Sequence, residues 1–318
     1  DAETGIISTI DNYEYDCDRT TLTLSFAPCE SYIISISPVP IDSNVITIDD
    51  QPQFKKVIEL DSEWDFYTEK FNALPLNEWK YSTFVSGGGE WYAQVHSYKT
   101  DFYIEAELDS AKILIDGLLN ETVWWKSTKI HVEVILNGNP ITEFVDGTYL
   151  DHQMKEAEIA SFLKRGKNTL EIKTASNLYP AGNLQEPVYI LGNFELRKQG
   201  SKTVAVLPSG KISTGDWAEQ GYPYYSGIGV YSQKINIPKT SKSVYLRMEK
   251  PGDLAEVIVN GEFASVMLWD PWITDITDLC KSGENEITIK VANSMANVLL
   301  MDTNPSGILG KVEICLEK

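Results

Sequence analysis

The sequence is poor in basic side chains, in histidine and in long apolar runs. Its 318 residues hold 27 Lys and Arg against 46 Asp and Glu, a formal net charge of −19. Binding to nucleic-acid phosphates or to anionic membranes requires clustered Lys and Arg, so we expect no nucleic-acid and no membrane partner. No apolar run reaches the ~18 residues of a membrane span. A hydrophobic content of 42% excludes a disordered chain.

Catalytic motifs are also missing. The sequence has three histidines (His96, His131 and His152) and no HExxH, GxSxG, P-loop or GxGxxG pattern. Glycoside hydrolysis requires a pair of carboxylates, but 46 acids make some close pair inevitable. The sequence shows no alternation of strand and helix patterns, so it does not predict a (β/α) barrel that could hold such a pair. We therefore expect that this chain does not catalyse by itself.

The four cysteines form no CxxC pair and no metal-ligand spacing. Cys17 and Cys29 flank a short strand-like run and could pair, and Cys280 and Cys315 lie in a later segment. All four cysteines could equally well be free thiols on strands. The cysteines therefore do not indicate whether the protein resides in an oxidising or a reducing compartment. The chain begins with Asp1 and no signal-peptide pattern follows, which predicts a mature product or an excised piece of a longer protein.

What the sequence does contain is a series of short strand patterns separated by turn residues. Thr20–Phe26 alternates with period two, and Asn-Gly pairs at 137–138 and 260–261 follow β-rich runs. Asn-Gly supplies the positive φ angles of a type I′ hairpin turn. The pattern predicts an all-β chain built of sandwiches. The one helix expected is short, over residues 155–163.

An internal repeat divides the chain. Three blocks recur in the same order: 132–138 as 255–261, 159–172 as 276–289, and 190–196 as 308–314. The repeat predicts two homologous β-sandwiches at 61–200 and 201–318. Residues 1–60 contain further strand patterns but too few for a core, so they predict a partial β-domain, the tail of an upstream sandwich.

Several of these segments resemble a known family. Gly227–Pro238 resembles the Gly-x-Gly-x-Tyr segment of the sugar-binding jelly roll of glycoside hydrolase family 2, and Trp269–Leu279 with Gly283–Asn285 resembles the stretch that follows it. This match covers nearly all of 215–318. Residues 61–200 match more loosely, and Phe71–Trp79 resembles a segment of rhamnosidase-like hydrolases such as family 106.

The resemblance implies two galactose-binding-like jelly rolls from the C-terminal region of a secreted or periplasmic bacterial glycoside hydrolase. In such enzymes the catalytic barrel lies upstream, so the upstream catalytic domain would be this chain's partner. Domains of this type often carry a structural calcium ion. Acidic clusters such as Asp16-Cys-Asp18 offer oxygen ligands, but no spacing is diagnostic, so calcium stays open and no other cofactor is expected.

Aromatic clusters in loops predict the ligand site. A sugar offers C–H faces to flat rings and hydroxyls to carboxylates and amides. The candidate ligand-binding residues are Trp269, Asp270, Trp272, Tyr222, Tyr224, Trp91 and Glu90. Large rings also fill sandwich cores, and we expect this for Trp217 and Tyr231.

Three functions remain open on this basis. The first is a non-catalytic carbohydrate-binding region that braces the catalytic domain and contacts glycan. The second is a structural scaffold between domains without sugar affinity, in which the same rings would be buried. The third is an autonomous carbohydrate-active enzyme, which requires a cleft with clustered Lys, Arg, Tyr or His.

Overall fold

The structure is a computed structural model that describes residues 9–10, 13–24, 26, 32–36, 54–88, 91–116, 131–176, 184, 187–239, 242–301 and 303–317. Nearly all regular structure in these ranges is β-strand, which confirms the predicted all-β class. The helical elements described there are short: η2 (Ala160–Phe162), η3 (Trp217–Gln220), η4 (Thr277–Leu279) and α1 (Ala296–Leu299). None of the described helices has the length and apolar character needed to cross a membrane.

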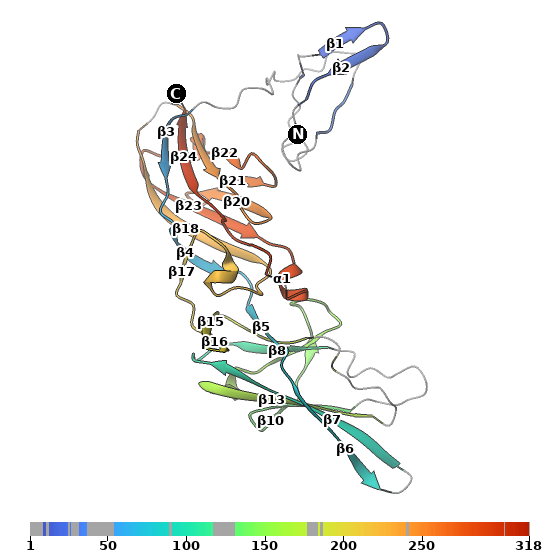
Figure 1. Ribbon diagram of the computed structural model, residues 1–318. Coiled ribbons are helices and arrows are strands. Elements are labelled where there is room, and N and C mark those ends of the chain that lie inside the picture. The colour runs from blue at the N-terminus through green and yellow to red at the C-terminus, as the bar shows by residue number, and fades with distance from the viewer. Residues whose placement is uncertain are drawn as a thin grey trace. The chain divides into compact units, whose positions relative to one another are not determined.

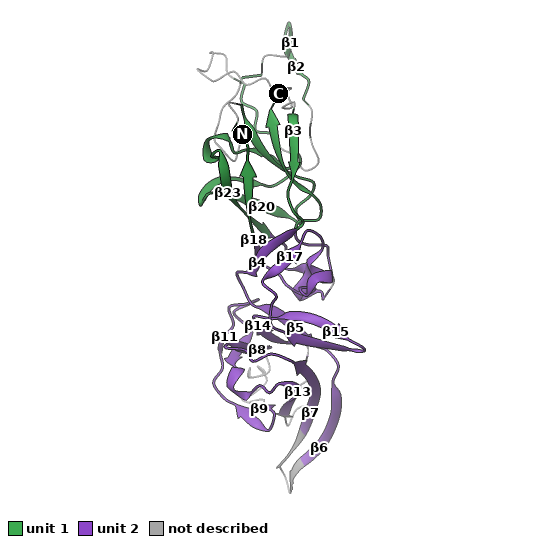
Figure 2. Cartoon of the chain, turned by 90° about the vertical axis from the view of Figure 1, so that its left-hand side faces the viewer, with its two compact units in different colours: residues 1–62, 231–291, 308–318 green, residues 63–230, 292–307 purple. Residues whose placement is uncertain are grey.

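The chain forms two compact units, coloured green and purple in Figure 2. The first comprises residues 1–62, 231–291 and 308–318, and the second comprises 63–230 and 292–307. The chain changes unit at four points, and two of these, 230/231 and 291/292, fall within the long strands β18 (Ile228–Ile237) and β23 (Gly283–Ala292). The domain boundaries at residues 60 and 200 remain a prediction.

The second unit contains a β-sandwich (Figure 1). One sheet has the order β10-β9-β13-β7-β16-β15, with β6 also paired to β7, and the other has the order β11-β12-β8-β14-β5. Leu136 and Ile172 from the first sheet and Ile113 and Ile190 from the second belong to one buried cluster between them. The strands are β5 (Asn72–Leu76), β6 (Lys80–Gly88), β7 (Trp91–Ile104), β8 (Ala111–Ile115), β9 (His131–Leu136), β10 (Asn139–Ile141), β11 (Val145–Asp146), β12 (Lys155–Glu158), β13 (Gly166–Ser176), β14 (Val188–Gly192), β15 (Glu195–Gln199) and β16 (Lys202–Val206). A further pair in this unit joins β4 (Glu63–Thr68) to β17 (Lys211–Ser213).

The first unit contains a four-stranded antiparallel sheet of order β22-β19-β24-β3 and the consecutive strands β18-β23-β20-β21 of a second sheet. Their bounds are β3 (Phe54–Glu59), β19 (Val244–Met248), β20 (Leu254–Val259), β21 (Glu262–Met267), β22 (Ile273–Asp275) and β24 (Val312–Glu317). A separate hairpin joins β1 (Tyr13–Asp16) to β2 (Arg19–Leu22). Since β3 pairs with β24, for example Ile58 opposite Ile314, a strand from the first 60 residues completes a sheet near the C-terminus.

The helix predicted over 155–163 is wrong. Residues 155–158 form β12, which pairs with β8 on one side and β11 on the other, and only Ala160–Phe162 forms a helical turn. The Lys-Glu-Ala-Glu sequence favours a helix by a few tenths of a kcal/mol per residue, roughly, and pairing with two neighbouring strands overrides that preference.

The Asn-Gly turns have the predicted backbone conformation. The φ angles are 54° and 86° at Asn137 and Gly138, and 53° and 84° at Asn260 and Gly261. Positive φ at both central positions is what a type I′ turn requires, and Asn and Gly tolerate it best. The sequence therefore identified both hairpins correctly.

Each Asn-Gly turn also anchors a buried asparagine network. Asn137 Nδ2 donates to the Phe162 carbonyl and to Asn168 Oδ1, both at 2.8 Å, while Asn137 Oδ1 accepts from the Thr169 amide at 3.0 Å. Asn168 in turn accepts from the Lys164 amide at 2.8 Å and donates to the Lys164 carbonyl at 2.7 Å. One buried amide thus closes the loop before β13.

The first unit repeats this network atom for atom. Asn260 Nδ2 donates to the Leu279 carbonyl at 2.8 Å and to Asn285 Oδ1 at 2.9 Å, and its Oδ1 accepts from the Glu286 amide at 3.1 Å. Asn285 bonds to the amide and the carbonyl of Lys281 at 2.8 and 2.7 Å. The sequence repeat therefore includes a repeated structural device.

We expect the substitution Asn168→Ala to lower the free energy of unfolding by roughly 2–4 kcal/mol, because it leaves buried polar groups without partners. Asn139→Ala is the matched control: Asn139 is exposed and makes one 3.4 Å bond to the Leu136 carbonyl, so the loss should stay within about 0.5 kcal/mol. Urea denaturation followed by tryptophan fluorescence measures both. Equal losses in the two variants would contradict the role given to the network.

Cys17, Cys280 and Cys315 are free thiols, while Cys29 lies outside the described residues. Burial, followed by the nearby Asp275 carboxylate, raises the pKa of Cys280 to about 11. Burial also raises the pKa of Cys315. Both thiols are therefore protonated at neutral pH.

Alkylation by iodoacetamide should accordingly be slow at Cys280 and Cys315 and fast at the exposed Cys17. Only the thiolate reacts, so the rate at Cys280 should rise about tenfold per pH unit until the pH approaches its raised pKa. Peptide mapping by mass spectrometry resolves the three sites. Equal rates at all three sites in the folded protein at neutral pH would show that burial does not control these thiols.

Candidate functional site

The Trp269–Trp272 loop, predicted as a ligand site, connects β21 to β22 in the first unit. Asp270 is exposed, and Trp269 and Trp272 are each half-buried. The Trp272 carbonyl accepts a 2.8 Å hydrogen bond from the Met248 amide on β19, and the Asp270–Pro271 peptide bond is cis. The loop is thus tied to the sheet by its backbone and presents a carboxylate beside two partly accessible rings.

Tyr222 lies in the second unit in a buried cluster of rings. It is 4% exposed, and its ring centroid lies 5.4 Å from that of Phe66 and 6.2 Å from that of Tyr225. Burial raises the pKa of the Tyr222 phenol, with the Glu195 carboxylate as the next cause. The ring centroid of Trp217 lies 5.5 Å from that of Tyr225, and Trp217 is fully buried, as predicted.

The remaining predicted residues are described only in part. Tyr224 is half-buried and packs against two apolar clusters of the second unit. Trp91 begins β7, opposite Gly88 in β6. Glu90 lies outside the described residues. Whether any of the predicted residues contacts a ligand remains a prediction.

A polar site that the sequence did not reveal lies on the five-stranded sheet of the second unit. Along β8, Ala111, Ile113 and Ile115 belong to the core cluster, so the alternation of a strand places Lys112 on the opposite face. In β12 the same rule places Glu156 on that face, opposite Leu114. The sheet therefore carries charged side chains on an outer face that is otherwise apolar.

Lys112 and Glu156 form an ion pair there. Lys112 Nζ donates to Glu156 Oε1 at 2.9 Å and lies 3.9 Å from Glu158 Oε1. Glu156 is 4% exposed, so its charge needs this partner. Thr148 Oγ1 donates to the same oxygen at 3.5 Å. In the part of the chain that the structure describes, both hydrogen bonds of Glu156 end on Oε1, and Oε2 accepts none.

A pocket of 400 Å³ opens on one side of this ion pair. Its wall combines the polar side chains Thr148 and Asn193 with the rings of Phe71 and Tyr149. Tyr149 donates its hydroxyl to the Phe71 carbonyl at 2.8 Å, which ties the two loops that frame the pocket. Burial, followed by the nearby Tyr225, raises the pKa of Tyr149, so the phenol stays a neutral donor.

A second pocket, of 490 Å³, is lined by Lys112 and Glu156 as well. Its other polar groups are Thr142, Glu143 and Glu158. Both volumes fall within the range of about 300–1,000 Å³ that is usual for small-molecule sites. We call the two pockets together the Lys112–Glu156 groove.

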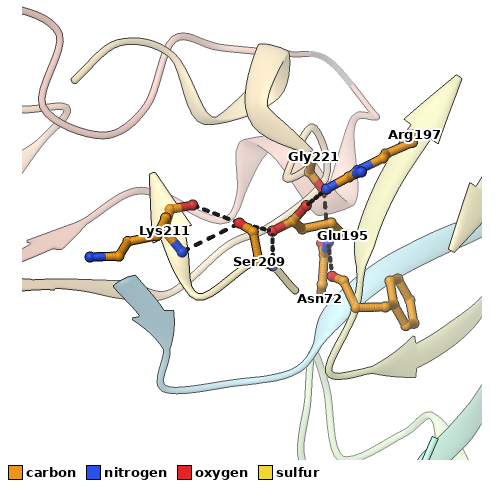
Figure 3. A network of polar contacts seen from close by, with 7 residues as sticks. Asn72, Glu195, Arg197, Ser209, Lys211 and Gly221 are labelled. Carbon is orange, nitrogen blue, oxygen red and sulfur yellow. Dashed lines mark hydrogen bonds and ion pairs between the residues drawn. The ribbon is translucent and has the colours of Figure 1, made fainter. Parts of the chain in front are cut away.

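A second buried carboxylate, Glu195, is fully engaged in holding the fold (Figure 3). Its Oε1 accepts from the amide and the hydroxyl of Ser209 at 2.6 and 2.8 Å, and its Oε2 accepts from Arg197 at 2.9 Å. Next to it, Asn72 Nδ2 donates to the Gly221 carbonyl at 3.0 Å. A Cβ at Gly221, where φ is 100°, would lie 2.9 Å from Glu195 Cβ, so only glycine fits.

Glu195→Ala should therefore lower the free energy of unfolding by about 2–3 kcal/mol, because the Ser209 amide and hydroxyl lose their acceptor. Arg197→Ala should cost less, about 1 kcal/mol, because Glu195 keeps both hydrogen bonds from Ser209 and the lost ion pair involves an Arg197 side chain that is 57% exposed. Thermal and urea unfolding measure both variants. A larger loss for Arg197→Ala than for Glu195→Ala would reverse this assignment.

Within the described ranges, no group of three or more His, Cys, Asp or Glu side chains is arranged to hold a metal ion. The groove was missed because its two central residues come from strands 44 positions apart, and Glu156 lay in a segment predicted as helix. The alternation of residues 111–115 was the available signal.

Comparisons with known proteins give partial similarities. No protein-family model matches the chain. A protein named putative beta-glucuronidase from Formosa agariphila is 30% identical over 87 residues, which cover 26% of this chain and 8% of that protein. A solved rhamnosidase from Novosphingobium sp. PP1Y aligns with a TM-score of 0.31 and 18% identity over 78% of this chain and 25% of its own. A beta-D-mannosidase from Dictyoglomus thermophilum aligns with a TM-score of 0.24 and 11% identity over 75% of this chain and 31% of its own.

This chain thus spans a small part of the curated relative and less than a third of each of these solved structures. The TM-scores are low, so the alignments do not define a shared arrangement of the whole chain. The proteins that it resembles in part are named as glycoside hydrolases.

Proposed function

We propose that this chain is a non-catalytic accessory region of a larger bacterial glycoside hydrolase, secreted or periplasmic, that contacts glycan and braces an upstream catalytic domain. In this proposal residues 61–200 and 201–318 are galactose-binding-like sandwiches and residues 1–60 are the end of an upstream domain, apart from β3, which pairs with β24 of the first unit. The partial match to a putative beta-glucuronidase and the sequence motifs of 215–318 support this placement.

The Lys112–Glu156 groove is the observation that carries the glycan-binding part. A sugar needs hydrogen-bond acceptors and donors for its hydroxyls and an apolar surface for its C–H faces. The groove offers Glu156 Oε2, the Thr148 hydroxyl and the Asn193 amide beside Phe71 and Tyr149. Such a mixture of polar groups and rings in a concave site is typical of small-molecule binding.

Glu156 Oε1 accepts a hydrogen bond from Lys112 Nζ at 2.9 Å, and this charge-assisted bond fixes the orientation of the carboxylate. A carboxylate held in this way can accept hydrogen bonds from sugar hydroxyls at Oε2. The proposal also includes a structural calcium ion, and no residues are assigned to hold it.

The Trp269–Trp272 loop is proposed as a second glycan contact, in the first unit. A scaffold without sugar affinity is the other candidate function, and the half-burial of Trp269 and Trp272 is the observation that favours it. Rings that pack only against protein would not change affinity for any glycan.

A glycan array followed by calorimetry distinguishes these functions. We expect binding in the micromolar to millimolar range, about −8 to −4 kcal/mol. Glu156→Gln should weaken binding in the groove, Trp269→Ala and Trp272→Ala should weaken any binding at the loop, and Glu107→Ala, an exposed residue outside both, should change neither. A folded chain that binds no glycan would contradict the proposal, and the structural scaffold without sugar affinity would remain as the function.

A further inference from the structure

The two pockets of the Lys112–Glu156 groove have a common wall. Lys112 and Glu156 line both, while Asn193 lines only the 400 Å³ pocket and Glu143 lines only the 490 Å³ pocket. A ligand in either pocket would therefore contact the same ion pair. The 490 Å³ pocket also reaches the core side chains Ile141 and Ala157.

Strand order gives the direction and extent of the groove. Leu191 of β14 lines one pocket and Val145 of β11 lines the other. Between them the sheet order is β14-β8-β12-β11, which makes three strand spacings. At about 4.8 Å per spacing the groove spans about 14 Å across the strands, more than one pyranose ring covers.

Glu156 Oε2 lies in the middle of this span as an acceptor. The carboxylate is buried, and within the described residues its two hydrogen bonds end on Oε1. A donor on a ligand that crosses the ion pair would complete its hydrogen bonding. A hydroxyl of a sugar residue is such a donor.

The charge of the groove limits which sugars fit. Its charged side chains are four glutamates and two lysines: Glu69, Glu143, Glu156, Glu158, Lys70 and Lys112. The excess of negative charge, on a chain of net charge −19, repels a carboxylate on a ligand. Neutral sugars are not repelled.

We propose that the groove binds one neutral oligosaccharide chain of two or more sugar residues, which crosses β14, β8, β12 and β11 over the Lys112–Glu156 pair. This inference rests on the proposed glycan-binding function and adds the length and the charge of the ligand. It assigns one sugar residue to each pocket and the ion pair to the linkage region between them.

Calorimetry on a ladder of oligosaccharides tests it. The probes are manno-, cello- and xylo-oligosaccharides of one to six residues, with oligogalacturonides of the same lengths as anionic counterparts. For the neutral series that binds, affinity should rise at least about tenfold between the monosaccharide and the tetrasaccharide, with one chain bound per protein. A monosaccharide that binds as tightly as the tetrasaccharide, or an oligogalacturonide that binds more tightly, would overturn the inference and leave the glycan-binding function in place.

Matched variants locate the bound oligosaccharide. Glu143→Ala and Asn193→Ala each remove an exposed side chain from one pocket, and Glu107→Ala is the exposed control outside both. Each of the first two should weaken tetrasaccharide binding several-fold, whereas at most one should change monosaccharide binding. Tetrasaccharide affinity that is unchanged in both variants overturns the inference. Absence of binding to every neutral probe and every array glycan overturns the proposed function with it.

Discussion

The groove depends on the pairing of two charged side chains on one face of a sheet. Because side chains alternate along β8 and β12, the residues that build the sandwich core leave Lys112 and Glu156 together on the other face. Glu156 is 4% exposed, and a carboxylate buried to that extent requires a nearby cation. The ion pair therefore follows from strand register, and both pockets are organised around it.

The two asparagine networks show how the same chain fixes its turns. Asn168 and Asn285 are almost fully buried, and each bonds to both the amide and the carbonyl of the lysine four residues before it. Buried backbone groups need such partners, so one amide side chain holds a whole connection between strands. The same network therefore fixes the corresponding turn in each unit.

Local features of this fold were predictable from the sequence, and pairing across the sheet was not. The Asn137–Gly138 and Asn260–Gly261 turns could be predicted from residue type and spacing. The burial of Trp217 and Tyr231 followed from their place in the strand pattern of the family that the sequence resembles. The groove could not be predicted, because Lys112 meets Glu156 only through the pairing of β8 with β12. That pairing also turned a segment with helix propensity into a strand, which the local sequence could not indicate.

The central claim is that the Lys112–Glu156 groove holds a neutral glycan. The most direct measurement is a crystal structure of the chain saturated with a neutral oligosaccharide that it binds in solution. The account predicts ordered sugar density across β14, β8 and β12, with a hydroxyl within hydrogen-bond distance of Glu156 Oε2. Density for the sugar elsewhere on the chain, with the groove empty, would contradict it.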